Sequence, residues 1–274
     1  VNMLAIPEVK GLFQKAIAQS GLPNCVCTHE TARQNIDLYL EGMGMTEKDI
    51  PKLKEMDPFE MLKGIAYVSQ KHQYKNPGMF LPGPVIDALL PVRPIEAIKK
   101  GSAKDVKLII GTNMHEGSMF VHPENTGFPN SWAMVAEMME RNGHAESIPQ
   151  IIDYYHPSRN DRLAELKAQR ELSVSSVPPI PEELQLEGAY PFIEFATDYA
   201  FQMPSVKVAE AQRQYTEDVW MYRYEYISRS GWESGSLASH AYELPLCFKN
   251  MDFHFSRFVF KDEPDEIVNT FMNE

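Results

Sequence analysis

The chain has 274 residues, of which 43% are hydrophobic and 23% are charged, the proportions of a folded globular protein rather than a disordered one. Its formal net charge of -12 opposes binding to nucleic acid or to an anionic membrane, because like charges repel at long range. Three cysteines are too few for a disulfide scaffold, which favours a reducing cytoplasm, and a neutral small molecule is the expected partner.

The N-terminal third is predicted to hold one strand between helices. A helix is expected at the start, and residues 11–21 form an apolar stretch, closed by a glycine, that predicts a short strand. Apolar residues then recur at helical spacing from 28 to 65, and residues 74–94, rich in Pro and Gly, predict an ordered loop. The boundary signals in the helical part are the N-cap Thr28, the stop residues Gly42 and Gly44, and Asp57-Pro58 at the start of a further helix.

Two further strands are predicted in the rest of the chain. Residues 106–111, preceded by a helix over 94–101, form an apolar run typical of a buried parallel strand, and the alternating aromatic stretch 219–226 predicts another. Helices are expected between them over 131–141, 147–155, 159–172 and 184–214, the last divided by Gly188, Pro191 and Pro204, with a Ser/Pro-rich linker over 173–181. This order predicts an α/β fold with a mostly parallel sheet and helical insertions.

A carboxylate follows the second predicted strand directly, in the turn Gly-Thr-Asn-Met-His-Glu-Gly. Functional sites of open α/β sheets lie just beyond the C-terminal ends of the strands. A glutamate there, Glu116, can accept a hydrogen bond from a histidine ring, fix its tautomer and stabilise the imidazolium as it forms. The alternative is an ordinary solvated acid on a turn.

A histidine follows the third predicted strand, in the small-residue loop Ala-Ser-His-Ala-Tyr. Histidine can take up and return a proton near neutral pH, as acyl transfer requires. His240 is therefore the candidate base, and the alternative is a surface or packing residue.

Five ordered segments carry a family resemblance. They are Gly-Leu-Phe-Gln-Lys-Ala-Ile-Ala-Gln-Ser-Gly (11–21), Leu-Pro-Gly-Pro-Val-Ile-Asp (81–87), Leu-Ile-Ile-Gly-Thr-Asn-Met-His-Glu-Gly (108–117), Thr-Asp-Tyr-Ala-Phe (197–201) and Ala-Ser-His-Ala-Tyr-Glu-Leu-Pro-Leu-Cys-Phe (238–248). Together they span most of the chain and resemble the type-B carboxylesterase and cholinesterase-like family, with the bacterial para-nitrobenzyl esterases as the nearest group.

The resemblance implies an α/β-hydrolase fold and a Ser-His-Glu triad in which Glu116 is the acid and His240 the base. No nucleophile is identified, because the only two glycines four residues apart flank Glu233 rather than a serine. The resemblance therefore implies that residues 1–274 are the C-terminal portion of one α/β-hydrolase catalytic domain. The N-terminal portion would hold the nucleophile and the oxyanion loop, so this chain is expected to be inactive alone.

Two supporting residues are also implied by the resemblance. Ser20 either places its hydroxyl close to the triad acid or simply caps the end of its strand. Glu243 either braces the loop of His240 or makes a buried structural hydrogen bond. The turn residues Met114 and His115, and Ala88 after Asp87, depart from the usual family pattern without touching these roles.

Two other functions remain as alternatives. A metal hydrolase is suggested by His115-Glu116 with His122, but a helical metal motif needs its second histidine four residues after the first, and here it comes seven later. No metal or cofactor is expected. The second alternative is a non-catalytic cholinesterase-like binding module, which would lack the nucleophilic serine in the parent protein.

Overall fold

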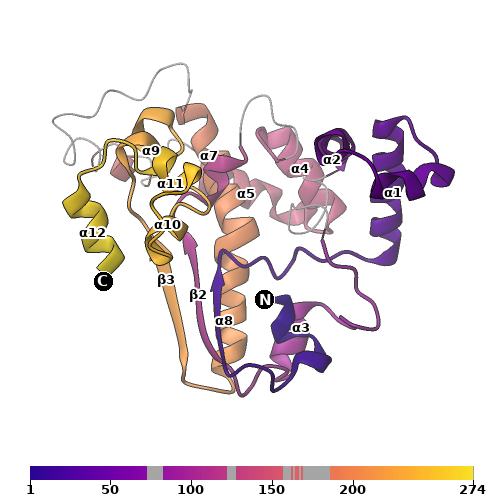
Figure 1. Ribbon diagram of the computed structural model, residues 1–274, viewed down its shortest axis with the longest axis horizontal. Helices are drawn as coiled ribbons and strands as arrows, with labels where there is room; N and C mark the ends of the chain where they lie inside the picture. Colours follow the sequence, from indigo (N-terminus) through magenta and orange to yellow (C-terminus); the bar gives the residue numbers. More distant parts are fainter. Residues whose placement is uncertain are drawn as a thin grey trace.

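The computed structural model describes residues 1–72, 83–121, 128–156, 162, 164–166, 168 and 186–273. Its sheet has three parallel strands in the order β1-β2-β3, which confirms the predicted parallel α/β arrangement (Figure 1). The strands are β1 (Lys15–Gln19), β2 (Lys107–Asn113) and β3 (Val219–Tyr224). The apolar stretch at 11–21 thus forms a strand only in its second half, and β2 runs two residues beyond the predicted end.

The segment after β1 is helical over the predicted range 28–65. The loop predicted over 74–94 lies partly outside the described residues, and its described part, 83–93, contains no helix. The N-cap Thr28 accepts a hydrogen bond from the backbone of Thr31 at 3.2 Å, and Gly44 ends the first helix with φ of 64°. Gly42 does not stop this helix; it lies inside it, where a Cβ would come 2.5 Å from that of Tyr67. The helices are α1 (His29–Met43), η3 (Glu47–Lys54), α2 (Pro58–His72) and α3 (Pro94–Lys99).

The start of the chain differs from the predicted helix. It forms two short 3-10 turns, η1 (Asn2–Leu4) and η2 (Pro7–Val9). Pro7 cannot donate a backbone hydrogen bond, and Ile6 before it is extended, with φ of -79° and ψ of 119°. A continuous helix is therefore interrupted at this point.

The helices after β2 agree with the prediction over 131–155. Further on, the range predicted to hold two or three helices contains three helical segments, α7, the π-helical η8 and α8, which follow one another without a gap. Pro204 lies in the first turn of α8, as a predicted boundary would, whereas Gly188 and Pro191 lie inside α7. The charged helix over 159–172 and the linker over 173–181 fall wholly or mostly outside the described residues. The helices here are η5 (Glu116–Met119), α4 (Trp132–Arg141), η6 (Ala145–Ser147), α5 (Ile148–Tyr155), α7 (Leu186–Ala196), η8 (Thr197–Gln202) and α8 (Met203–Arg213).

The two faces of the sheet differ in their cover. Helix α8 packs against β2 and β3 (Figure 1). Its Val208 belongs to the same core as Leu108 and Ile110. On the opposite face Ile17, Ile109 and Trp220, which are paired across the strands, are 68%, 39% and 53% exposed. The expectation of a buried second strand therefore holds for one face only, since successive side chains point to opposite faces.

Short helices follow β3 and gather near the end of the sheet toward which the strands point (Figure 1). None of the helices in the described part of the chain is long and apolar enough to cross a membrane. The four helices that complete the chain are α9 (Arg229–Ser234), α10 (Leu244–Cys247), α11 (His254–Val259) and α12 (Asp265–Asn273).

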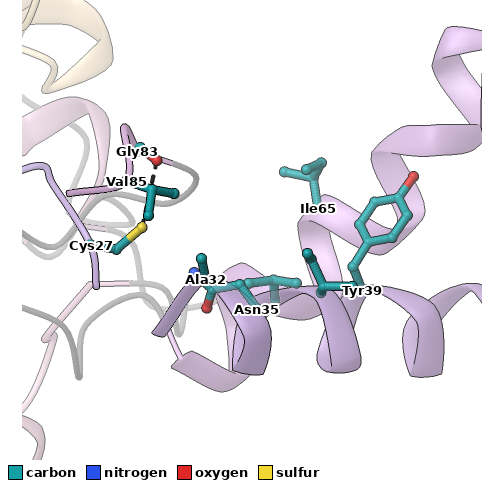
Figure 2. Close-up of a pocket in the computed structure, with 9 residues that line it drawn as sticks. Cys27, Ala32, Asn35, Tyr39, Ile65, Gly83 and Val85 are labelled. Atoms are coloured by element: carbon teal, nitrogen blue, oxygen red, sulfur yellow. Dashed lines mark hydrogen bonds between the residues drawn. The ribbon is translucent and has the colours of Figure 1, made fainter. Parts of the chain in front are cut away.

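A cavity of about 240 Å³ lies between α1, α2 and the bridge that joins Cys27 to Val85 (Figure 2). Its lining is mostly apolar, with Asn35 and the Cys27 thiol as polar members. No residue that lines it is among the predicted site residues.

Candidate active site

Glu116 lies at the first position of η5, three residues after the end of β2, and is fully buried. Its Oε1 accepts two hydrogen bonds, from the Ser20 hydroxyl at 2.5 Å and from the backbone N–H of Asn113 at 2.6 Å. Ser20 directly follows β1, so the C-terminal ends of two adjacent strands hold this oxygen. The two donors leave the other carboxylate oxygen, Oε2, to face the loop after β3.

His240 occupies that loop and meets the free oxygen of the carboxylate. Its Nδ1 lies 2.6 Å from Glu116 Oε2, and because a carboxylate only accepts, the Nδ1–H is the donor. The His240 side chain is 29% exposed, and its ring is flanked by Phe120 and Phe201, whose centroids are 5.4 and 5.2 Å away. The contact through Nδ1 fixes the ring and leaves Nε2 for another partner.

The π-helical segment η8 supplies part of this environment. Phe201 belongs to it, and so does Thr197, whose hydroxyl accepts a hydrogen bond from the backbone of Gly117 at 2.9 Å. Such π turns occur often at functional sites, because they shift side chains relative to a regular helix. Here the segment contacts both the turn of Glu116 and the ring of His240.

A second carboxylate, Glu243, is buried in the same loop. Its Oε2 accepts a hydrogen bond from the Asn113 side chain at 2.6 Å, and the same amide donates to the carbonyl of Ser239 at 2.6 Å. Burial raises the pKa of Glu243, and the Asn113 hydrogen bond opposes that rise. Residue 113 therefore contacts both carboxylates, one through its backbone and one through its side chain.

His115, beside the candidate acid, is buried and its ring lies against Tyr190. Its Nε2 lies 3.3 Å from the Tyr190 hydroxyl, and its Nδ1 has no hydrogen-bond partner among the described residues. Burial, with a smaller contribution from Arg223, lowers the pKa of His115 to about 3. This ring is therefore neutral at ordinary pH.

Left-handed backbone conformations are concentrated around the site. Ser20, Leu237 and Ala241 have φ of 49°, 58° and 68°, although none is a glycine. Each such residue costs about 1 kcal/mol or more and persists only where the surrounding contacts over-determine it. The backbone next to the candidate acid and base is thus held in place by its neighbours.

The structure brings together all four residues singled out in the sequence, namely Glu116, His240, Ser20 and Glu243. Sequence reasoning missed Asn113, which lies in the Gly-Thr-Asn turn and could have been noted for its amide. It also missed the two phenylalanines beside His240, although Phe201 ends one of the five segments that carry the family resemblance. His122, which suggested a metal site, lies outside the described residues. Within the residues that are described, no group of side chains is suited to hold a metal ion.

Comparisons with known proteins agree with this architecture. A model of the carboxylesterase family matches residues 1–274. The para-nitrobenzyl esterase of Bacillus subtilis (strain 168) is 28% identical over 250 residues, which are 91% of this chain and 44% of that protein. A thermophilic PNB esterase structure is 26% identical with a TM-score of 0.68, covering 98% of this chain and 48% of the other.

A carboxylesterase structure from Geobacillus stearothermophilus, at 23% identity and a TM-score of 0.61, supports the fold alone. The solved relatives place the chain in the α/β-hydrolase fold. This chain spans between 44% and 50% of the length of the relatives cited above.

Proposed function

Because the chain belongs to the carboxylesterase family, we propose that it supplies the acid, Glu116, and the base, His240, of a serine esterase that hydrolyses carboxylic esters. The proposal is carried by the 2.6 Å contact between His240 Nδ1 and a fully buried carboxylate, at the C-terminal end of a parallel strand. This is the edge of an open α/β sheet where functional sites form. It is also the geometry that an acyl-transfer base requires.

The proposed chemistry follows from the tautomer that this contact selects. With its proton on Nδ1, His240 presents the Nε2 lone pair, which removes the proton of a serine hydroxyl as the serine oxygen attacks the ester carbonyl. Glu116 stabilises the imidazolium that results. The imidazolium returns the proton to the departing alcohol, and water then releases the acid from the acyl-enzyme by the same proton exchange.

The serine and the oxyanion donors are proposed to come from a portion of the protein outside residues 1–274. The chain contains no Gly-x-Ser-x-Gly turn. The exposed apolar row of Ile17, Ile109 and Trp220 offers a surface against which such a portion would pack. This chain would then be one part of a single catalytic domain and would not turn over esters alone.

The proposed substrates are neutral esters with an apolar group. Phe120 and Phe201 pack against the His240 ring and give the site an aromatic neighbourhood that suits an apolar substrate group. The relative from Bacillus subtilis carries the name para-nitrobenzyl esterase, and an aromatic ester of that kind is a suitable first substrate.

The test compares His240→Ala with His254→Ala, a substitution of an exposed histidine, in the complete protein, meaning this chain together with the portion that carries the nucleophile. His240→Ala is expected to lower kcat by at least about 10⁴-fold, while His254→Ala stays within about twofold of the parent. Wild-type turnover by His240→Ala would refute the assignment. A complete protein that neither hydrolyses esters nor reacts with a fluorophosphonate would instead support a binding module.

A further inference from the structure

Strand β2 ends on Asn113, a fully buried residue that makes three hydrogen bonds in two directions. Its backbone N–H donates to Glu116 Oε1 at 2.6 Å. Its side-chain Nδ2 donates to the carbonyl of Ser239 and to Glu243 Oε2, each at 2.6 Å. The same residue therefore touches the candidate acid and both sides of the loop that carries the candidate base.

The two side-chain bonds use the full donor capacity of the amide. A carboxamide nitrogen carries two hydrogens, and both find acceptors here. These acceptors also fix the orientation of the amide, since Ser239 and Glu243 present only oxygen atoms to it. Ser239 immediately precedes His240, and Glu243 follows it by three residues. The amide therefore binds the loop at one residue before and one residue after His240 in the chain.

We propose that Asn113 is a positioning residue whose carboxamide holds the 239–243 loop, so that His240 stays within hydrogen-bond reach of Glu116. The inference rests on the proposed function of this pair. Loss of the amide would leave the acid in place, because the backbone N–H of residue 113 and the Ser20 hydroxyl still hold it. The base would lose two of the contacts that fix its loop, and a displacement of about 1 Å can cost about 100-fold in rate.

The Asn113 amide is uncharged, which matters because it lies beside the buried carboxyl group of Glu243. The charged or titratable groups around Asn113 and its acceptor Glu243 are Glu116 from η5, His240 and Glu243 from the loop, Tyr222 and Tyr224 from β3, and Cys247 from α10. Burial raises the pKa of both tyrosines and of the thiol, so these three remain protonated. A carboxyl group at position 113 would therefore face the Glu243 carboxylate and the Ser239 carbonyl with one donor at most.

A matched control exists at the other end of the same strand. Gln212 is also fully buried, and its Nε2 donates to the carbonyls of Ala103 and Val106, each at 2.7 Å. Its acceptors are backbone carbonyls rather than a carboxylate. Asn113→Asp and Gln212→Glu thus remove the same number of donors from equally buried sites, but only the first places a new carboxyl beside an existing one.

The experiment measures kcat and KM for an aromatic ester from pH 5 to 9 in the complete protein, with the melting temperature at each pH. Asn113→Asp is expected to lower kcat by about 100-fold at pH 7, with KM within about threefold. The loss deepens as the pH rises, because the introduced carboxyl shares a proton with Glu243 at low pH and repels it once that proton is gone. Gln212→Glu is expected to lower the melting temperature but to leave kcat within about twofold wherever it remains folded.

If Asn113→Asp does not fold, Asn113→Ser tests the same inference. It retains one donor and adds no charge, so kcat falls by about tenfold without the additional loss at high pH. The inference is overturned if Asn113→Ser keeps kcat within about twofold, or if Asn113→Asp and Gln212→Glu give the same pH profile. Failure of the proposed function is distinguishable, because His240→Ala would then retain activity whatever the Asn113 variants do.

Discussion

The two ends of strand β2 share one structural feature, a buried side-chain amide, but only the C-terminal end carries the candidate site. At each end a fully buried side-chain amide donates two short hydrogen bonds, from Gln212 at the N-terminal end and from Asn113 at the C-terminal end. In both amides the oxygen has no hydrogen-bond partner among the described residues. What differs is the acceptors, which are two backbone carbonyls at one end and a carbonyl with a carboxylate at the other.

Burial and hydrogen bonding alone therefore do not identify a functional site. The amide of Gln212 satisfies carbonyls in the connection from α3 to β2, as any buried turn requires. At the other end Glu116 and Glu243 are buried together, although burial raises the pKa of the second. Burying two carboxylates so close together is unfavourable for the charged forms, and such pairs occur most often at catalytic sites.

The largest effect is expected when one carboxylate at each end of β2 is replaced by its amide, Glu116→Gln at the C-terminal end and Asp218→Asn at the N-terminal end. Two donors already hold Glu116 Oε1, so Glu116→Gln must turn its NH₂ toward His240. The ring then accepts at Nδ1 and carries its proton on Nε2, the wrong nitrogen for a base. We expect kcat in the complete protein to fall by about 10³-fold or more.

The control at the opposite end is Asp218→Asn, which removes a half-exposed ion pair between Asp218 and Lys107, 2.7 Å long. Such a pair contributes about 1 kcal/mol or less, so activity and stability should change little. Comparable losses of kcat in Glu116→Gln and Asp218→Asn would abolish the distinction between the ends.

Glycines near the two ends give a second, smaller contrast. In Gly117→Ala the new Cβ would lie 2.3 Å from the carbonyl oxygen of Ile193, so the turn of Glu116 must shift. We expect a loss of about 1 to 3 kcal/mol in unfolding free energy and a fall in kcat of about tenfold or more.

Near the other end, Gly101 has φ of 81°, and Gly101→Ala is expected to cost about 1 to 2 kcal/mol through backbone strain. Chemical denaturation and steady-state kinetics on the same preparations separate the two effects. Unchanged kcat in folded Gly117→Ala would argue that the acid turn tolerates displacement.

The smallest expected effect concerns pH and His115, since the site end of β2 carries this buried titratable ring while Gln212 at the other end does not ionise. The folded-state pKa of His115 is about 3, below the ordinary value of 6.5. Between these values the unfolded chain binds a proton that the folded chain does not, so stability falls as the pH falls, by up to about 1.4 kcal/mol per pH unit.

His115→Gln removes this titration. Urea denaturation at pH 7 and pH 5 should show that the variant gains on the wild type by roughly 1 to 2 kcal/mol at the lower pH. His115→Phe, which does not titrate either, should give the same relative gain. Parallel stability curves for all three proteins would contradict the assigned shift.

Much of the fold was predictable because its signals are local. Thr28 caps α1 and Gly44 ends it, since both act within one turn of the helix. The prediction that Gly42 ends the helix was wrong. This glycine leaves room for Tyr67 of α2, a contact between residues that are far apart in the chain. Pro204 lies in the first turn of α8, directly after η8, where a proline is tolerated because the backbone N–H of that turn has no partner within the helix.

The residue types that follow the ends of the strands could be predicted from the sequence, which indicated Glu116 and His240 as a candidate pair. Turn chemistry and strand periodicity act over a few residues and can be read directly. The contacts of the Asn113 amide with residues 239 and 243, which are 126 and 130 positions away, follow from the tertiary fold. Contacts across such separations depend on how β2 and the loop after β3 pack together, and no local pattern encodes that.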